Sequence, residues 1–147
     1  MVIDLNEKAA SNLSIGRLGP TKMDLLPSNI RPSSEIEAYQ IQDCLHQILI
    51  DSGVGNLVGH KIGCTTSVMQ KFLDINNPCA GGIFDSTSHQ LSGSFIFDKL
   101  LHPGVECEIA VFLKKDLPEI DVKYNRESVS FAVEAVMAAI EVVDDRW

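Results

Sequence analysis

Hydrophobic positions recur at helical spacing in the second quarter of the chain. Ser34, followed three residues later by Glu37, is a capping-box pair, which satisfies free amides where a helix begins. Asp51-Ser52-Gly53 supplies an end signal. Between them, apolar side chains three or four residues apart mark one helical face: Ile41, Cys44, Leu45, Ile48 and Leu49. The pattern therefore predicts a helix that starts after Ser34.

Shorter patterns predict strands and further helices along the rest of the chain. Strands are expected over residues 57–62, 83–84, 94–97, 105–113 and 140–144, and helices over 65–72 and 127–138. A loop is expected from Asn76 to Gly82, and a turn at His102-Pro103-Gly104. Strands interleaved with two solid helices favour an α/β or α+β fold over a helical bundle.

The first 32 residues are weakly patterned. Glycines and prolines interrupt them and leave room for one short helix near Asn6 to Leu13. We therefore divide the chain into an irregular, partly helical segment over residues 1–32 and a folded part over residues 33–147.

Composition and charge narrow the function classes. The chain has 147 residues, with 45% hydrophobic and 22% charged, which is one domain's worth of sequence and excludes general disorder. The net charge of −8 is poorly suited to binding phosphates, so nucleic acid is not an expected partner. The longest apolar run, Ala135 to Ile140, is too short to span a bilayer, and the first 20 residues lack a signal-peptide core. The expected location is the cytosol.

The four cysteines are not spaced like zinc ligands. We expect reduced thiols, mostly in the core, because disulfides are rare in cytosolic proteins. The cysteines are Cys44, Cys64, Cys79 and Cys107.

Two glutamates on one strand face are the clearest chemical feature. Glu106 and Glu108 alternate with apolar residues, so they point to the same side, roughly 6.6 Å apart at Cα. The apolar opposite face indicates a strand packed in a core, where two uncompensated carboxylates are costly. A hard divalent cation such as Mg²⁺ would compensate them, with Glu141 on a second strand as a third ligand. The alternative is an edge strand with both glutamates in water.

A lysine between glycines is the second chemical feature. Lys61 lies in Gly59-His60-Lys61-Ile62-Gly63, where glycines permit close approach of a ligand. Its ammonium group could bind a carboxylate or move a proton, whereas a surface lysine is the simpler interpretation. His60 should face the opposite side and be structural.

The remaining candidates are weaker. His46 and His89 are expected to face solvent, and His102 precedes the glutamate strand. Asp145 alternates onto the face of Glu141 but reads as a solvated ion-pair residue, while the role of Asp144 stays open.

Several ordered motifs together resemble the fumarylacetoacetate hydrolase superfamily. The motifs are Pro103-Gly104-Val105-Glu106-Cys107-Glu108-Ile109-Ala110, Asp116-Leu117-Pro118 and Ala139-Ile140-Glu141-Val142-Val143-Asp144-Asp145-Arg146. The branch that they resemble most is that of the 2-keto-4-pentenoate hydratases and 4-oxalocrotonate decarboxylases. Gly59 to Thr66, with Met69-Gln70, is similar to the lysine segment of that branch, and Ala38 to Asp43 is similar to its first helix.

The resemblance implies a fold, a metal site and a reaction. The fold would be α+β, a mixed β-sheet roll of the fumarylacetoacetate hydrolase C-terminal-domain type, incomplete in this chain. Glu106, Glu108 and Glu141 would hold Mg²⁺ or Mn²⁺, which the 2-oxo acid substrate chelates, and Lys61 would be the acid/base or carboxylate-binding group beside Gly63. The activity would be hydration of a 2-hydroxy-2,4-dienoate to a 4-hydroxy-2-oxo acid in aromatic catabolism. The partners would be the substrate, further copies of the chain and a related decarboxylase.

Two departures keep alternatives open. Some hydratases of this branch have an acid in the loop where this chain has Cys79, which weakens the choice of reaction. Relatives also continue past the Asp144-Asp145-Arg146 segment, so the chain resembles the N-terminal portion of an enzyme. The alternatives are a decarboxylase, an acylpyruvate C–C hydrolase, or an inactive fragment or supporting subunit.

Overall fold

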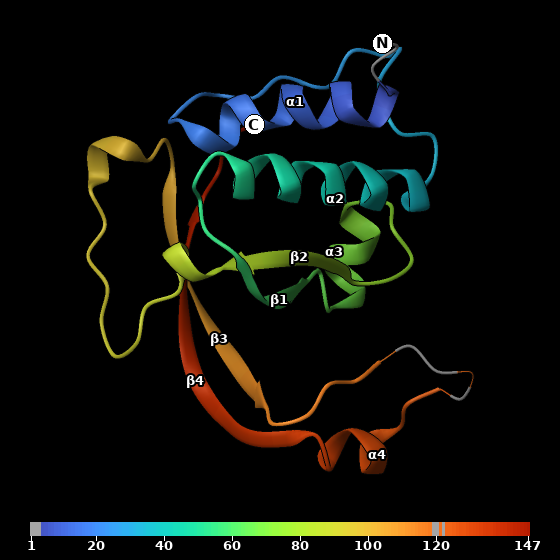
Figure 1. Cartoon of the computed structure of the whole chain (residues 1–147), viewed down its shortest axis with the longest axis vertical. Coiled ribbons are helices and arrows are strands. Elements are labelled where there is room, and N and C mark those ends of the chain that lie inside the picture. Colours follow the sequence, from blue (N-terminus) through green and yellow to red (C-terminus); the bar gives the residue numbers. More distant parts are fainter. Residues whose placement is uncertain (1–3, 119–120, 122) are drawn as a thin grey trace. The chain divides into compact units, whose positions relative to one another are not determined.

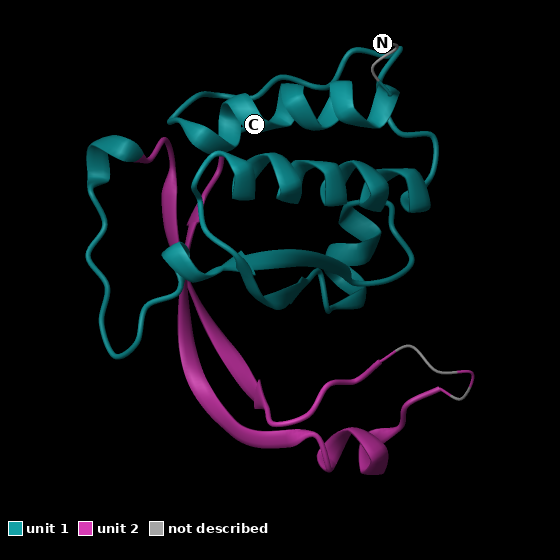
Figure 2. Cartoon of the chain, viewed as in Figure 1, with its two compact units in different colours: residues 1–99, 146–147 teal, residues 100–145 magenta. Residues whose placement is uncertain are grey.

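The computed structural model describes residues 4–118, 121 and 123–147 and divides into two compact units (Figures 1 and 2). Unit 1 comprises residues 1–99 with 146–147, and unit 2 comprises residues 100–145. Unit 1 contains α1 (Leu5–Leu18), α2 (Glu35–Asp51), β1 (Leu57–Gly63), α3 (Ser67–Phe72), β2 (Cys79–Phe84) and the 3₁₀ turns η1 (Asp85–Thr87) and η2 (Phe97–Lys99). Unit 2 contains β3 (Pro103–Leu113), α4 (Arg126–Ser130) and β4 (Val133–Asp144). The division into residues 1–32 and 33–147 stays a prediction.

Helices α1 and α2 lie side by side and form the core of unit 1 (Figure 1). Ala9 and Ala10 are fully buried against Ile41, which is 3% exposed. The small alanines let the two helices approach closely. The first helix is longer than the expected 6–13 and runs through Gly16. A Cβ at Gly16 would overlap the Met23 side chain, so the glycine is used for packing and does not break the helix.

The predicted start of α2 is confirmed, with one change of partner. The Ser34 side chain accepts a hydrogen bond from the Glu37 backbone N–H at 3.2 Å. The Glu37 carboxylate accepts from the backbone N–H and the hydroxyl of Ser33, at 2.7 and 2.8 Å. These two hydrogen bonds lower the pKa of Glu37.

Strands β1 and β2 pair antiparallel, which corrects the expected loop over residues 76–82. Gly63 pairs with Cys79 and Leu57 with Phe84, so the second strand begins three residues before Gly82. Tyr39 accepts a hydrogen bond from the Ala80 N–H at 3.0 Å, which fixes the start of β2 against α2. The tertiary contacts override the weak local strand signal of a glycine pair.

His46 is half-buried, which corrects the expectation that it faces solvent. Its ring meets Phe84 edge-on, with centroids 5.7 Å apart and planes at 80°, and Phe84 is 2% exposed. A Cβ at Gly82 would lie 2.9 Å from the His46 ring, so the glycine is needed for this contact. Desolvation is the main cause of a lowered His46 pKa.

The expected strand over residues 94–97 is wrong. Residues 92–96 carry no regular structure, and Phe97 to Lys99 form a 3₁₀ turn, with the Lys99 N–H bonded to the Ile96 carbonyl at 3.0 Å. His89 is exposed as expected, and its ring contacts Phe95 edge-on at 5.5 Å.

In unit 2, β3 and β4 form one long antiparallel pair. Pro103 pairs with Asp144 at one end and Leu113 with Val133 at the other. The predicted strands over 105–113 and 140–144 are confirmed and extended, but the helix expected over 127–138 is wrong because α4 ends at Ser130. From Val133 onward each residue gains strand partners on β3, which outweigh the helical spacing of the valines.

The strand face opposite Glu106 and Glu108 is exposed within the described residues, contrary to the expected core packing. Val105, Ile109 and Ile140 are 71%, 74% and 73% exposed.

None of the helices formed by the described residues is long and apolar enough to cross a membrane.

Candidate functional site

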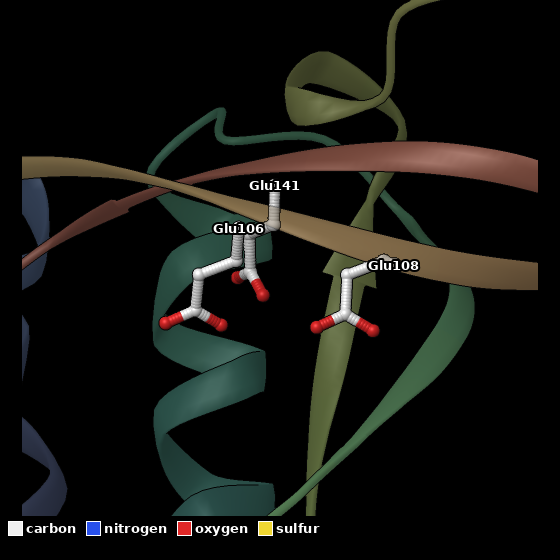
Figure 3. Close-up of side chains that lie close together, drawn as sticks. All are labelled: Glu106, Glu108 and Glu141. Atoms are coloured by element: carbon white, nitrogen blue, oxygen red, sulfur yellow. The ribbon is translucent and has the colours of Figure 1, made fainter.

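Three carboxylates converge on one face of the β3–β4 pair (Figure 3). Glu106 lies directly opposite Glu141 in the register, and Glu108 is two residues further along β3. Directly opposed residues, and residues two apart, point to the same side of a sheet. Each of the three side chains offers an oxygen within 4.8 Å of the others. The structure therefore brings together the three glutamates that the sequence singled out.

The electrostatics of this cluster favour a cation. Three ionised carboxylates within 4.8 Å repel one another by about 1 kcal/mol for each pair in water, and more where water is partly excluded. Glu106 and Glu108 are exposed and Glu141 is half-buried, so solvent reaches the oxygens. Carboxylate oxygens are the donors that Mg²⁺ and Ca²⁺ prefer. The donor set fits a hard divalent ion, whose binding would remove the repulsion.

Asp144 anchors the end of the strand pair and does not join the carboxylate cluster. Its Oδ1 accepts hydrogen bonds from the backbone N–H groups of Leu101 and His102, both at 2.8 Å. The carboxylate thus holds the chain entering β3 against the end of β4. These two hydrogen bonds give Asp144, whose role the sequence left open, a structural role.

Lys61 lies in the middle of β1, opposite a glycine. Its Cα partner is Gly81, and a Cβ at Gly81 would lie 3.5 Å from the Lys61 Cγ and 3.7 Å from its Cε. The lysine stem therefore extends across the glycine backbone of β2, with its side chain exposed. Sequence reasoning missed this supporting glycine, although the Gly81-Gly82 pair is a visible signal for a close backbone approach.

Gly63 and His60 complete the lysine strand. Gly63 is exposed, and nothing lies within 4 Å of the position that a Cβ would take there. The open space suits close approach of a ligand to the backbone. His60 is exposed opposite Gly82, and the Lys61 and Gly63 roles stay predictions.

The cysteines are less buried than the sequence suggested. Cys44 and Cys64 are half-buried, whereas Cys79 and Cys107 are exposed, and all four are free thiols. The expectation of core positions is wrong for Cys79 and Cys107, which are exposed on strands of two-stranded sheets.

Sequence comparison relates the chain to bacterial hydratases. It is 37% identical over 109 residues to the 2-keto-4-pentenoate hydratase of Paraburkholderia phymatum, covering 74% of this chain and 40% of that protein. It is 36% identical over 114 residues to the 2-hydroxyhexa-2,4-dienoate hydratase of Comamonas testosteroni, covering 75% of this chain and 41% of that protein. No family model matches the chain.

Structure comparison finds the same fold in a solved protein. The 4-oxalocrotonate decarboxylase from Pseudomonas putida G7, complexed with magnesium and adipate, superimposes with a TM-score of 0.84 at 23% identity. The match covers 97% of this chain and 53% of that chain. A second structure of that decarboxylase, complexed with calcium and acetate, gives the same TM-score.

The expected α+β class is thus confirmed by a match to part of the 4-oxalocrotonate decarboxylase fold, and both strand pairs of the described residues are antiparallel. The resemblance to the 2-keto-4-pentenoate hydratase and 4-oxalocrotonate decarboxylase branch is also confirmed. The chain spans about two-fifths of the length of the hydratases that it matches.

Proposed function

We propose that this chain carries the metal-holding part of a lyase of the hydratase type. Its substrate would be a 2-hydroxy-2,4-dienoate, and its product a 4-hydroxy-2-oxo acid formed by addition of water. The observation that carries the proposal is the convergence of Glu106, Glu108 and Glu141 within 4.8 Å on one strand pair. Relatives named as hydratases of 2-oxo or dienoic acids support the choice of reaction.

The three glutamates would hold one Mg²⁺ or Mn²⁺. The ion, when bound, supplies Lewis acidity that stabilises negative charge on the 2-oxygen of the substrate. The chain contributes three oxygen donors from two hydrogen-bonded strands, so the register of β3 and β4 fixes their spacing before any ion binds. The solved decarboxylase complexes with magnesium and with calcium support a divalent ion.

Lys61 has one of two roles in the proposed reaction. Its ammonium group either pairs with the substrate carboxylate or moves a proton at Nζ as the dienol becomes the conjugated ketone. Gly63, two residues on, would let the substrate approach the backbone because no side chain occupies that space.

Calorimetric titration with Mg²⁺ tests the site. The wild-type chain should bind the ion, whereas the Glu106→Gln/Glu108→Gln variant should give no binding signal. Glu134→Gln is the matched control, because it removes one carboxylate from an exposed position of β4 outside the cluster. Equal binding in all three proteins, or in none, would contradict the proposed metal site.

Decarboxylation is the second candidate reaction, because the solved structural neighbour is a 4-oxalocrotonate decarboxylase. The two reactions differ in product: hydration consumes a dienoate without gas release, whereas decarboxylation of a 2-oxo diacid releases CO₂. Parallel assays of dienoate loss and CO₂ release in Mg²⁺ therefore separate them. Cleavage of an acylpyruvate would instead favour the C–C hydrolase alternative. Inactivity in all three assays would favour a supporting subunit.

The proposal extends to assembly and location. We expect a homo-oligomer in the cytosol, with a related decarboxylase as a further partner. Light scattering on the purified chain would measure the mass of the assembly, and a monomer would contradict the first expectation.

A further inference from the structure

Two of the four cysteines meet at one end of the β1–β2 pair. Gly63 is the register partner of Cys79, and Cys64 follows Gly63 directly. Interaction with Cys64 is among the causes that raise the pKa of the Cys79 thiol, so the two thiols lie close together. The other two cysteines lie on different elements, Cys44 on α2 and Cys107 on β3.

The backbone at Cys64 explains how the thiols come together. In a regular strand Cys64 would point away from the face shared by Gly63 and Cys79. Cys64 instead has a φ of 56°, in the left-handed region that residues other than glycine seldom adopt. The left-handed conformation interrupts the strand alternation at Cys64, so its side chain need not point away from Cys79. Backbone strain of this kind persists only where the surroundings hold it.

Hydrogen bonds hold the backbone on both sides of the cysteine pair. Gln70 donates from its side-chain amide to the Cys64 carbonyl at 2.8 Å. Tyr39 accepts from the Ala80 N–H, and Gln42 donates to the Ala80 carbonyl at 3.1 Å, so the residue next to Cys79 is fixed from α2. Directly paired residues such as Gly63 and Cys79 have Cα atoms roughly 4.5–5.5 Å apart, and Cys64 is the next residue along the chain, so the two cysteines are near enough for a disulfide.

We propose that Cys64 and Cys79 form a reversible intramolecular disulfide when the protein meets a disulfide oxidant such as oxidised glutathione. The exposed Cys79 thiolate attacks one sulfur of oxidised glutathione, which forms a mixed disulfide and releases one glutathione thiolate. The half-buried Cys64 thiolate then attacks the Cys79 sulfur and releases the second glutathione. Two protein thiols are oxidised, one glutathione disulfide is reduced to two thiols, and the two protons go to solvent or to the glutathione thiolates.

The disulfide would close a loop that contains α3, and it would join the end of β1, the strand that carries Lys61, to β2. Residues 65–78 lie between the two cysteines, and Gly63 immediately precedes Cys64. The cross-link would thus restrict the segment that carries Lys61 and Gly63. The proposal itself concerns only the thiols and does not depend on the proposed lyase activity.

Oxidation of the purified chain by oxidised glutathione tests the proposal. The number of thiols that react with a chromogenic disulfide reagent under denaturing conditions should fall from four to two, and dithiothreitol should restore four. Peptide mass mapping without reduction should find residues 64 and 79 joined in a monomer. Oxidation should also raise the Tm, because the closed loop restricts the unfolded chain.

Matched variants identify the cysteines. Cys64→Ser and Cys79→Ser should each abolish the intramolecular disulfide. Because its partner is missing, the remaining cysteine should keep any glutathione adduct that it forms. Cys44→Ser and Cys107→Ser should still form it and should lose only two thiols on oxidation. The proposal is overturned if the wild-type chain keeps four thiols, retains glutathione on Cys79, or dimerises through Cys107. Peptide mass mapping of the wild-type chain alone distinguishes these outcomes.

Discussion

Replacing Glu108 with glutamine should stabilise the metal-free protein. The carboxylate of Glu108 has oxygens within 4.8 Å of those of Glu106 and Glu141, so the substitution removes two repulsive pairs. At this distance each pair costs about 0.9 kcal/mol in water. Rotation of exposed side chains reduces this cost, so the free energy of unfolding should rise by at most about 2 kcal/mol. For a chain of this length that corresponds to an increase in Tm of up to about 8 °C.

Mg²⁺ should reverse the order of stability. At a concentration 100 times its Kd, an ion that binds only the folded wild type contributes about 2.7 kcal/mol to stability. Glu108→Gln lacks one donor and should gain much less, so it should melt above the wild type in EDTA and below it in Mg²⁺.

Thermal unfolding followed by circular dichroism at low salt measures both arms of this prediction. Raising the ionic strength should shrink the difference in EDTA, because salt screens exposed charges. Glu134→Gln is the control and should show neither effect. The reasoning is refuted if Glu108→Gln lowers the Tm in EDTA, or if Mg²⁺ raises the Tm of wild type and variant equally.

Four further predictions concern single residues. Lys61→Ala should lower the rate of dienoate hydration at least about 100-fold while the Mg²⁺ Kd stays within about twofold, and equal damage to both would contradict its assigned role. Gly82→Ala should destabilise the protein by about 1–3 kcal/mol in chemical unfolding, because the new methyl group overlaps neighbouring side chains. Desolvation, together with Cys64 and a nearby glutamate, raises the pKa of the Cys79 thiol. The rate of its alkylation by iodoacetamide should therefore keep rising above the pH at which the rate for an ordinary thiol levels off. Cys64→Ser should shift this pH profile of the alkylation rate to lower pH. Ser34→Ala should cost about 1 kcal/mol of stability by chemical unfolding, because it removes the acceptor at the start of α2, and an unchanged midpoint would show that the cap contributes nothing.

The sequence predicted best those helices whose first residues include a capping side chain. The start of α2 follows from Ser34 and Glu37, and α3 begins after Thr66, whose side chain accepts from the Met69 N–H at 3.3 Å. These contacts lie within four residues in sequence, so the pattern contains them. The segment after Ser130 shows the opposite case, because its valines suit either a helix or a strand. Pairing with β3, 20 or more residues away, decides between them, and no local pattern records that pairing.

The candidate site divides in the same way. A period of two places Glu106 and Glu108 on one side, which the sequence predicts without any partner. The resemblance implied that Glu141 joins them as a ligand, but its position directly opposite Glu106 depends on the register of the strand pair, which only the structure shows. The meeting of Cys64 with Cys79 could not be predicted, because it needs a left-handed residue at the end of β1 and a strand where the sequence indicated a loop.

The position of Glu106 opposite Glu141 makes the triad depend on strand alignment and not on the segment that joins the two strands. Lengthening that segment near Tyr124 should leave the alignment, and therefore the three donors, in place. One extra residue between Val133 and Glu141 would instead turn the Glu141 carboxylate to the opposite face of the sheet. Related proteins can thus vary the connection freely as they diverge, whereas single-residue insertions or deletions inside either strand should be selected against.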